Sequence, residues 1–335
     1  MTAAIAAANV GGWQAESRAA AGDWQPRYIL ASAMYGNFSL AEILPEVAKT
    51  GAASIDLWPK PHGTQREEID ALGEAEVKAL LAEYGVNLGG IACYRLGPFN
   101  LADEFALAAR LGDRVTLVTT ARDDTQATGT ALKSELKQFL QKLSPTIATA
   151  EKTGSILAIE NHSHSLINSP DSIRWFGELS KSKNVGIALA PHHLPQDAEL
   201  IAALARDLGP QLKFVYAQQH GRGFSEKLPK EKEMLQMPGR GSLDFEPLMR
   251  QLASQQFNGP VEIFMHPVPR GVPSSTQSLR LPQRSEHLGN TSMAYWPRDI
   301  TSAVNTTRRF LQNAKTLKAG WCGTLIVCSG HKKRS

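Results

Sequence analysis

Short apolar runs alternate with longer amphipathic stretches from Tyr28 to about Leu317. The apolar runs have the length of buried strands and predict eight of them: Tyr28–Met34, Ser54–Trp58, Asn87–Tyr94, Val115–Thr119, Ser155–His162, Val185–His192, Leu212–Gln219 and Val261–His266. The stretches between them predict helices at Leu40–Lys49, Glu74–Tyr84, Leu101–Leu111, Ala131–Lys152, Ser172–Ser180, Ala198–Leu208, Phe245–Gln255 and about Ile300–Leu317.

Eight strands that are each followed by a helix are typical of a closed (β/α)8 barrel. An open, doubly wound sheet is the alternative, but it usually has a glycine-rich phosphate turn after its first strand. Ala33-Met34-Tyr35-Gly36 is not such a turn. The sequence therefore predicts the α/β class and a single barrel over residues 27–317, with a loose leader at 1–26 and a tail at 318–335.

The composition excludes several other classes. Hydrophobic residues make up 42% of the 335 positions and charged residues 20%, which is enough apolar content to fill a core. No apolar run approaches the roughly 18 residues of a membrane span. The net charge of +4 comes without a block of like charge, so neither a nucleic acid nor a membrane is expected as a partner.

Compartment and assembly follow from weaker signals. Cys93, Cys322 and Cys328 show no metal-finger spacing and are expected to be free thiols. The alanine-rich N-terminus lacks the basic start of a secretory signal, so a cytoplasmic protein is expected. Apolar residues between Trp321 and Val327 could pack on the barrel or on a second subunit, which leaves a homo-oligomer open.

Two long segments follow predicted strands, at His220–Leu243 and at Pro267 to about Trp296. Loops of that length in a compact domain are usually functional or disordered, and in a barrel both would lie on the catalytic face. Their cations are candidates for binding an anionic or polyhydroxyl substrate, although most surface cations are only solvated: Arg222, Lys227, Arg240 and Arg270.

Polar side chains gather where four consecutive strands end. Residues two apart in a strand share a face, which pairs Glu160 with His162, Gln218 with His220 and Glu262 with His266, and places His192 inward. A barrel interior accepts such groups only if they are paired, bind a metal or meet a substrate. Imidazole with carboxylate suits Mn, Fe, Co or Zn, so a divalent metal is expected.

Each of these residues also has a plainer interpretation. A single strand-end histidine is more often structural, Glu262 could pair with an internal cation, and His193 could face helices or solvent. On the second strand, Trp58 could stack on a sugar or plug the barrel mouth, and Lys60 or His62 could contact hydroxyls or phosphate.

Three segments carry a family resemblance: Leu157–His162, Pro238–Phe245 and Asn258–Ile263. With their Glu-Asn-His and Pro-Gly-x-Gly-x-x-Asp-Phe motifs, the sequence resembles the xylose isomerase-like TIM-barrel superfamily, in its sugar phosphate isomerase/epimerase group, over about residues 27–317. The resemblance implies a divalent metal held by Glu, Asp, His and Glu from strands five to eight, with the two Glu moving the substrate's proton.

The standard ligand positions are mostly lost in this chain. The first Glu is Glu160, but the other three positions fall on Ala190, Tyr216 and Phe264. A possible ligand reappears two residues later in each case: His192, Gln218 and His266. This pattern predicts a metal site moved toward the barrel mouth, built from His192 and His266 with Glu160 or His162, and with Gln218 or His220. A barrel that has lost its metal is the alternative.

The expected chemistry is enolisation beside the carbonyl of a sugar or keto-sugar, by an isomerase, an epimerase or a related lyase. Glu160 is the expected base, with His193 or Glu262 as a second group. The alternatives are a metal-free or non-catalytic sugar-binding barrel and, behind it, an endonuclease-IV-like phosphodiesterase. The nuclease would need more ligands than strands one, three and four offer.

Overall fold

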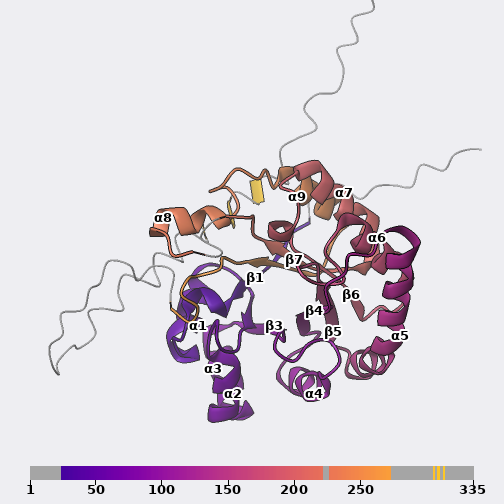
Figure 1. Ribbon diagram of the computed structural model, residues 1–335. Helices are drawn as coiled ribbons and strands as arrows, with labels where there is room; N and C mark the ends of the chain where they lie inside the picture. The colour runs from indigo at the N-terminus through magenta and orange to yellow at the C-terminus, as the bar shows by residue number, and fades with distance from the viewer. Residues whose placement is uncertain (1–23, 222–225, 273–304, 306–307, 310–311, 314–335) are drawn as a thin grey trace, which may run out of the picture.

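The computed structural model describes residues 24–221 and 226–272, together with residues 305, 308, 309, 312 and 313. Eight parallel strands pair in chain order and close into a barrel, as the sequence predicts (Figure 1). The strands are β1 (Arg27–Ala31), β2 (Ser54–Leu57), β3 (Asn87–Ala92), β4 (Thr116–Thr120), β5 (Ile156–Glu160), β6 (Val185–Leu189), β7 (Leu212–Ala217) and β8 (Pro260–Ile263).

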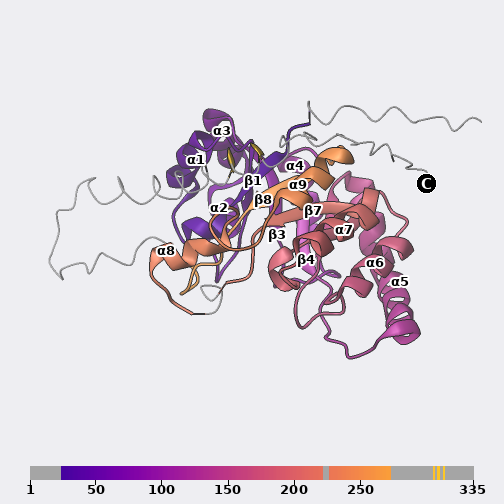
Figure 2. The same cartoon turned by 90° about the horizontal axis from the view of Figure 1, so that it is seen from above.

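Helices surround the sheet, with α5, α6 and α7 on one side of the barrel and α1, α2 and α3 on the other (Figures 1 and 2). The helices are α1 (Leu40–Lys49), α2 (Gln65–Leu72), α3 (Glu74–Tyr84), α4 (Ala102–Leu111), α5 (Gly129–Thr153), α6 (Pro170–Leu179), α7 (Ala198–Leu208), α8 (Lys230–Glu233) and α9 (Glu246–Ser254). No helix in the described part of the chain is long and apolar enough to cross a lipid bilayer.

The helix boundaries have local causes in the sequence. A capping box between Ser39 and Glu42 begins α1, and the Asp197 carboxylate accepts the amides of Glu199 and Leu200 at the start of α7. The left-handed Gly154 ends α5. These signals explain why α1 and α7 begin where the periodicity predicts and why α5 ends within a residue of its predicted end.

Two short helices do not follow from the apolar pattern. Helix α2 buries only Gln65 and Ile69, so it shows no apolar stripe. Helix α8 has the sequence Lys-Glu-Lys-Glu and interrupts the first long segment. Most of the last predicted helix, the second long segment and the tail, with Cys322 and Cys328, lie outside the described residues.

The barrel's packing extends at least to Trp24, three residues before the expected start at Arg27. Trp24 is buried, and its indole N–H donates to the Phe257 carbonyl at 2.6 Å. The end of the expected leader therefore belongs to the packed domain.

The strands end earlier than the apolar runs predict. Strand β6 stops at Leu189, β7 at Ala217 and β8 at Ile263, so the polar residues that follow lie beyond the strands. Strict alternation of side chains does not apply there, and this decides which side chains enter the barrel mouth.

Candidate active site

A cavity of about 550 Å³ opens at the carboxyl end of the strands. This is the end at which barrel enzymes place their active sites. Its lining includes Glu160 and six histidines: His62, His162, His164, His192, His193 and His266. Trp58, Tyr94, Tyr216 and Phe264 add aromatic surface, and Arg122 and Arg270 add positive charge.

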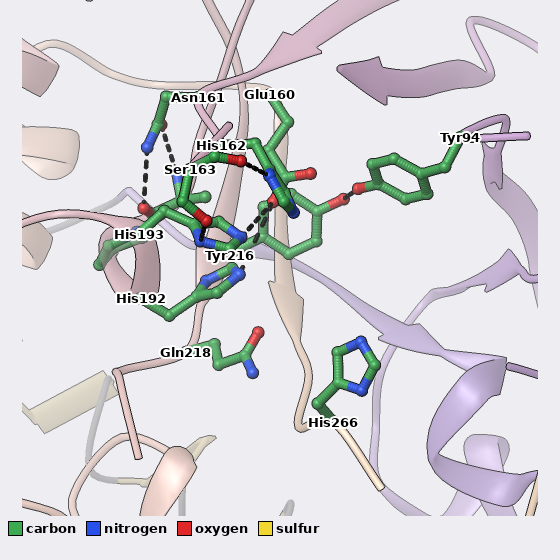
Figure 3. A network of polar contacts seen from close by, with 12 residues as sticks. Tyr94, Glu160, Asn161, His162, Ser163, His192, His193, Tyr216, Gln218 and His266 are labelled. Atoms are coloured by element: carbon green, nitrogen blue, oxygen red, sulfur yellow. Dashed lines mark hydrogen bonds and ion pairs between the residues drawn. The ribbon is translucent and has the colours of Figure 1, made fainter. Parts of the chain in front are cut away.

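Three of these side chains come together at the junction of β5 and β6. The Glu160 Oε1 atom lies 3.7 Å from His192 Nε2 and 3.8 Å from His193 Nε2 (Figure 3). One ligand atom from each residue lies within 4.8 Å of the others. The three side chains, which we call the Glu-His-His cluster, are each less than one-tenth exposed.

The turn after β6 explains why two consecutive histidines enter the cavity. Ala190 is clamped by Asn161, whose Oδ1 accepts from the Ala190 amide at 2.7 Å and whose Nδ2 donates to its carbonyl at 3.0 Å. Pro191 then begins a short 3-10 turn that ends at His193. The expectation that His193 could face helices or solvent is corrected, because both imidazoles of this turn point at Glu160. The Asn of the Glu-Asn-His motif serves as the clamp.

Burial controls the charge of the cluster. It raises the pKa of Glu160 to about 8, an effect that hydrogen bonding with the Tyr94 hydroxyl partly offsets. Burial lowers the pKa of His193 to about 3, with further lowering by His162 and His220. The pKa of His192 is lowered well below its usual value by burial and by His193. Neutral imidazoles keep their nitrogen lone pairs available at neutral pH.

The donor set of the Glu-His-His cluster fits a divalent transition metal. Two imidazoles and one carboxylate are a ligand set known for catalytic zinc, which keeps a further position open. Ligand atoms around a tetrahedral ion with bonds of about 2.0–2.1 Å lie about 3.3 Å apart, and the separations of 3.7 and 3.8 Å need only small movements. A cation would also hold Glu160 ionised despite its burial.

A tyrosine pair borders the cluster. The hydroxyls of Tyr94, which follows β3, and Tyr216, on β7, are 2.5 Å apart (Figure 3). The Tyr94 hydroxyl also lies close enough to Glu160 to lower the pKa of its carboxyl. If Tyr94 donates to the carboxylate, then Tyr216 donates to Tyr94, and the pair forms a chain of donors that ends at Glu160.

A second, deeper layer holds two more acids. Asp56 on β2 and Glu262 on β8 are fully buried and close enough to share a hydrogen-bonded proton. Burial raises the pKa of Asp56 to about 7, and burial together with Asp56 raises the pKa of Glu262 well above its usual value. Gly90 makes room for this pair, because a Cβ there would lie 2.5 Å from Asp56 Oδ1. Glu262 does not line the cavity, and its side chain lies below it in the barrel core.

Trp58 forms the floor between the two layers. It is 3% exposed and stacks on Phe264 with ring centroids 5.0 Å apart. Tyr94 packs against it at 5.2 Å. Most of the indole is therefore covered by protein, as expected for a residue that plugs the barrel mouth.

The wall opposite the Glu-His-His cluster carries His62, His266 and Arg270. An Arg270 guanidinium nitrogen lies 2.9 Å from His62 Nε2, and the rings of His62 and His266 meet edge to face at 4.8 Å. Burial and Arg270 lower the pKa of His62 to about 4, and burial with His62 lowers the pKa of His266 to about 3. His162 bridges toward the cluster, with its ring 4.0 Å from that of His193.

Several predicted site residues lie elsewhere. The Gln218 amide turns to Gln236 at 2.9 Å, and Lys227 pairs with the buried Glu233 at 3.1 Å. The remaining predicted residues that lie outside the cavity lining are His220, Lys60 and Arg240, and Arg222 lies outside the described residues.

The segment after β7 is fastened to the barrel by two glutamines. Gln236 Oε1 accepts the His266 amide at 3.0 Å, and its Nε2 donates to the His266 carbonyl at 3.2 Å. The Gln219 side chain accepts the Leu243 amide at 2.9 Å, and a Cβ at Gly241 would lie within 2.4 Å of it. The second glycine of the Pro-Gly-x-Gly motif thus allows the loop to cross Gln219.

The sequence interpretation missed Tyr94, Arg122, Asp123 and Ser163 in the lining. Tyr94 was included in a predicted strand, and its place at the end of that strand was the available signal. Arg122 and Asp123 have left-handed φ angles of 53° and 47°. Sequence patterns do not show such backbone conformations for residues other than glycine.

Residues 44–281 match the family described as xylose isomerase-like TIM barrel, and the chain belongs to this family. No protein with a curated description matches the sequence. A D-psicose 3-epimerase of Clostridium cellulolyticum, solved with D-tagatose, is 17% identical, with a TM-score of 0.58 over 85% of this chain and 99% of the other.

Two further solved structures share the fold. A protein called IOLI, solved with a bound zinc atom, is 14% identical, with a TM-score of 0.58 over 86% of this chain and 98% of the other. The probable 3-DHS dehydratase AsbF of Bacillus anthracis is 12% identical, with a TM-score of 0.55 over 86% and 99%. At these identities the likeness establishes the fold alone.

Proposed function

We propose that this protein is an isomerase or epimerase, or a related lyase, that removes a proton beside the carbonyl of a sugar or keto-sugar. One observation carries the proposal: a buried carboxyl, Glu160, faces two neutral imidazoles in a cavity at the catalytic end of the barrel. A bound cation would keep Glu160 ionised, and therefore able to take a proton, although burial alone raises its pKa.

The residues have distinct proposed roles. Glu160, His192 and His193 would hold a divalent metal, which when bound polarises a substrate carbonyl. A carboxylate oxygen of Glu160 takes the proton from carbon, and the tyrosine pair orients that carboxylate. Arg270, His62 and His162 face the same cavity and would bind the substrate's oxygen atoms.

The cavity favours chemistry with one carboxylate base. Its acidic lining residues are Glu160 and the exposed Asp123, and Phe264 occupies the position of the family's second Glu. Isomerisation and β-elimination can proceed with one such base, whereas epimerisation needs a proton from the opposite face. His62 and His266, on the opposite wall, are neutral at neutral pH and carry no acidic proton for that step, so isomerisation or β-elimination fits the cavity better.

Deuterium exchange tests this function without knowledge of the product. The full-length protein, loaded in turn with Mn, Fe, Co or Zn, is incubated in D2O with a panel that includes D-tagatose, D-psicose, other ketoses and keto-sugar acids. NMR then follows loss of the C–H signal beside each carbonyl. We expect exchange with at least one compound and its loss in Glu160→Gln. Exchange by no compound, or equal exchange by the variant, would contradict the proposal.

A further inference from the structure

A different cavity opens at the amino end of the strands, across the barrel from the candidate active site. It has a volume of about 410 Å³ and is lined by the first residues of β1, β4, β5, β7 and β8 and by the turns before several strands. Four of its lining residues are cations, and none is an acid: Arg27, Arg114, Lys183 and Lys213.

These four cations line one cavity and have no carboxylate partner among the described residues, unlike the cations that form ion pairs on the helices. Arginines such as Arg66, Arg110 and Arg174 form ion pairs with carboxylates at 2.8 Å. Within the described part of the chain, no carboxylate pairs with the four cations of this cavity, and the two bonds recorded for them go to carbonyls. Arg27 donates to Asn258 at 3.0 Å, and Lys213 donates to Pro210 at 2.7 Å.

Lys213 is held in the cavity by the fold. Its stem crosses Gly186, where a Cβ would lie 2.6 Å from Lys213 Cγ. The residue is half-buried, and burial together with the charge of Arg114 lowers its pKa. Lys213 therefore lies within the field of a second cation, Arg114, in a cavity without an acid, and a bound anion stabilises such an arrangement.

Two further features belong to the same cavity. Gln255 Nε2 is a buried donor without a hydrogen-bond partner in the described structure. Arg114 and Gln256 have left-handed φ angles of 52° and 50°. Strained backbone of this kind persists where the surroundings enforce it and is concentrated at functional sites. In the described residues, the other three non-glycine residues with left-handed φ angles, Arg122, Asp123 and His164, line the candidate active site.

We propose that this cavity is a second ligand site, which binds the diphosphate or clustered phosphate groups of a small molecule. Guanidinium groups match phosphate oxygens in pairs, and lysines add point charges. A compact ligand with several negative charges neutralises four cations, whereas a single carboxylate leaves most of them unbalanced. The proposal does not depend on the proposed enzymatic function.

Inorganic pyrophosphate and inorganic phosphate are the probes. Calorimetric titration of the metal-free, full-length protein at low ionic strength is expected to show one pyrophosphate site per chain and weaker phosphate binding. Lys213→Gln and Arg114→Gln should each weaken pyrophosphate binding by about tenfold or more. Asn258→Asp, which keeps the side-chain shape and adds a negative charge to the lining, should weaken it similarly.

Two controls locate the binding. Lys142→Gln removes the same charge from an exposed position on α5 and should leave the affinity unchanged. His192→Ala should also leave it unchanged, because that residue lies in the other cavity. Circular dichroism confirms that each variant is folded. Absence of saturable pyrophosphate binding, or binding that Lys213→Gln, Arg114→Gln and Asn258→Asp leave intact, would overturn the proposal.

Discussion

The barrel interior holds buried carboxyl groups in two layers, and their neighbours give them different character. In the upper layer, Glu160 faces His192 and His193 and borders an open cavity. In the lower layer, Glu262 faces Asp56, and both are fully buried. An acid beside neutral imidazoles has metal-binding atoms next to it, whereas an acid beside an acid must share a proton. Both acids are buried, so burial does not distinguish them. The residues beside each acid decide whether it can bind a metal and react or only holds a proton in the core.

The largest expected effect is the loss of activity when the acid of the upper layer is replaced, compared with replacement of the acid of the lower layer. Glu160→Gln should lower deuterium exchange by about 10²–10⁴-fold, because it removes the base. Glu262→Gln should leave exchange within about tenfold of the wild type. The measurement is the rate of deuterium exchange of each variant with the compound that the wild type exchanges fastest. An equal loss of exchange rate in both variants would show that the acids of the two layers do not differ in function.

The lower layer should be visible in the pH dependence of stability. Because Asp56 has a folded pKa of about 7 and an ordinary value of 3.8, the folded state keeps a proton that the unfolded state loses. Between these pH values the free energy of unfolding should fall as pH rises, by up to about 1.4 kcal/mol per pH unit. Neutral buried histidines act in the opposite direction below about pH 6.5, so the informative quantity is a difference between variants.

Urea unfolding of the wild type and Glu262→Gln across this range isolates the pair. The amide donates to Asp56 without needing a proton, so the variant should gain stability relative to the wild type as pH rises from about 4 to 7. Parallel stability curves would show that the two carboxyls hold no extra proton.

The tyrosine pair tests how far Glu160 depends on its neighbours. Tyr216→Phe removes the hydroxyl that hydrogen-bonds with the Tyr94 hydroxyl, a loss expected to lower exchange by about tenfold. Metal content should stay the same, because Tyr216 is outside the Glu-His-His cluster. Phe214→Leu, also buried on β7, is the matched control for packing. Unchanged exchange in Tyr216→Phe would show that the tyrosine pair does not orient the Glu160 carboxylate for proton transfer.

The smallest effect is expected from Gln218, whose amide points away from the cluster. Gln218→Ala should lower the free energy of unfolding by about 1–2 kcal/mol while metal content stays constant. Loss of metal in this variant, measured beside its stability, would argue for a site that includes β7.

The fold was predictable because eight apolar runs and the intervening helical periods give both element count and order. The site was predictable only in part. Glu160, His192 and His193 were expected from strand-end positions, but the turn at Pro191 decides that both imidazoles enter one cavity. The sequence does not show where a strand stops, and a strand that stops three residues early redirects every side chain beyond it. The Gln218 side chain points to Gln236, which lies 18 residues later in the chain. The sequence does not show this contact, because tertiary contacts set the path of the loop between them.

Metal content tests the central claim most directly. Protein purified without chelator or metal-affinity resin, then reconstituted with Mn, Fe, Co or Zn, is compared with His192→Ala, His193→Ala and the opposite-wall control His62→Ala. The account predicts about one ion per chain in the wild type and in His62→Ala, with affinity reduced more than about 100-fold in the other two. No bound ion in the wild type, or an ion kept by both His192→Ala and His193→Ala, would contradict it.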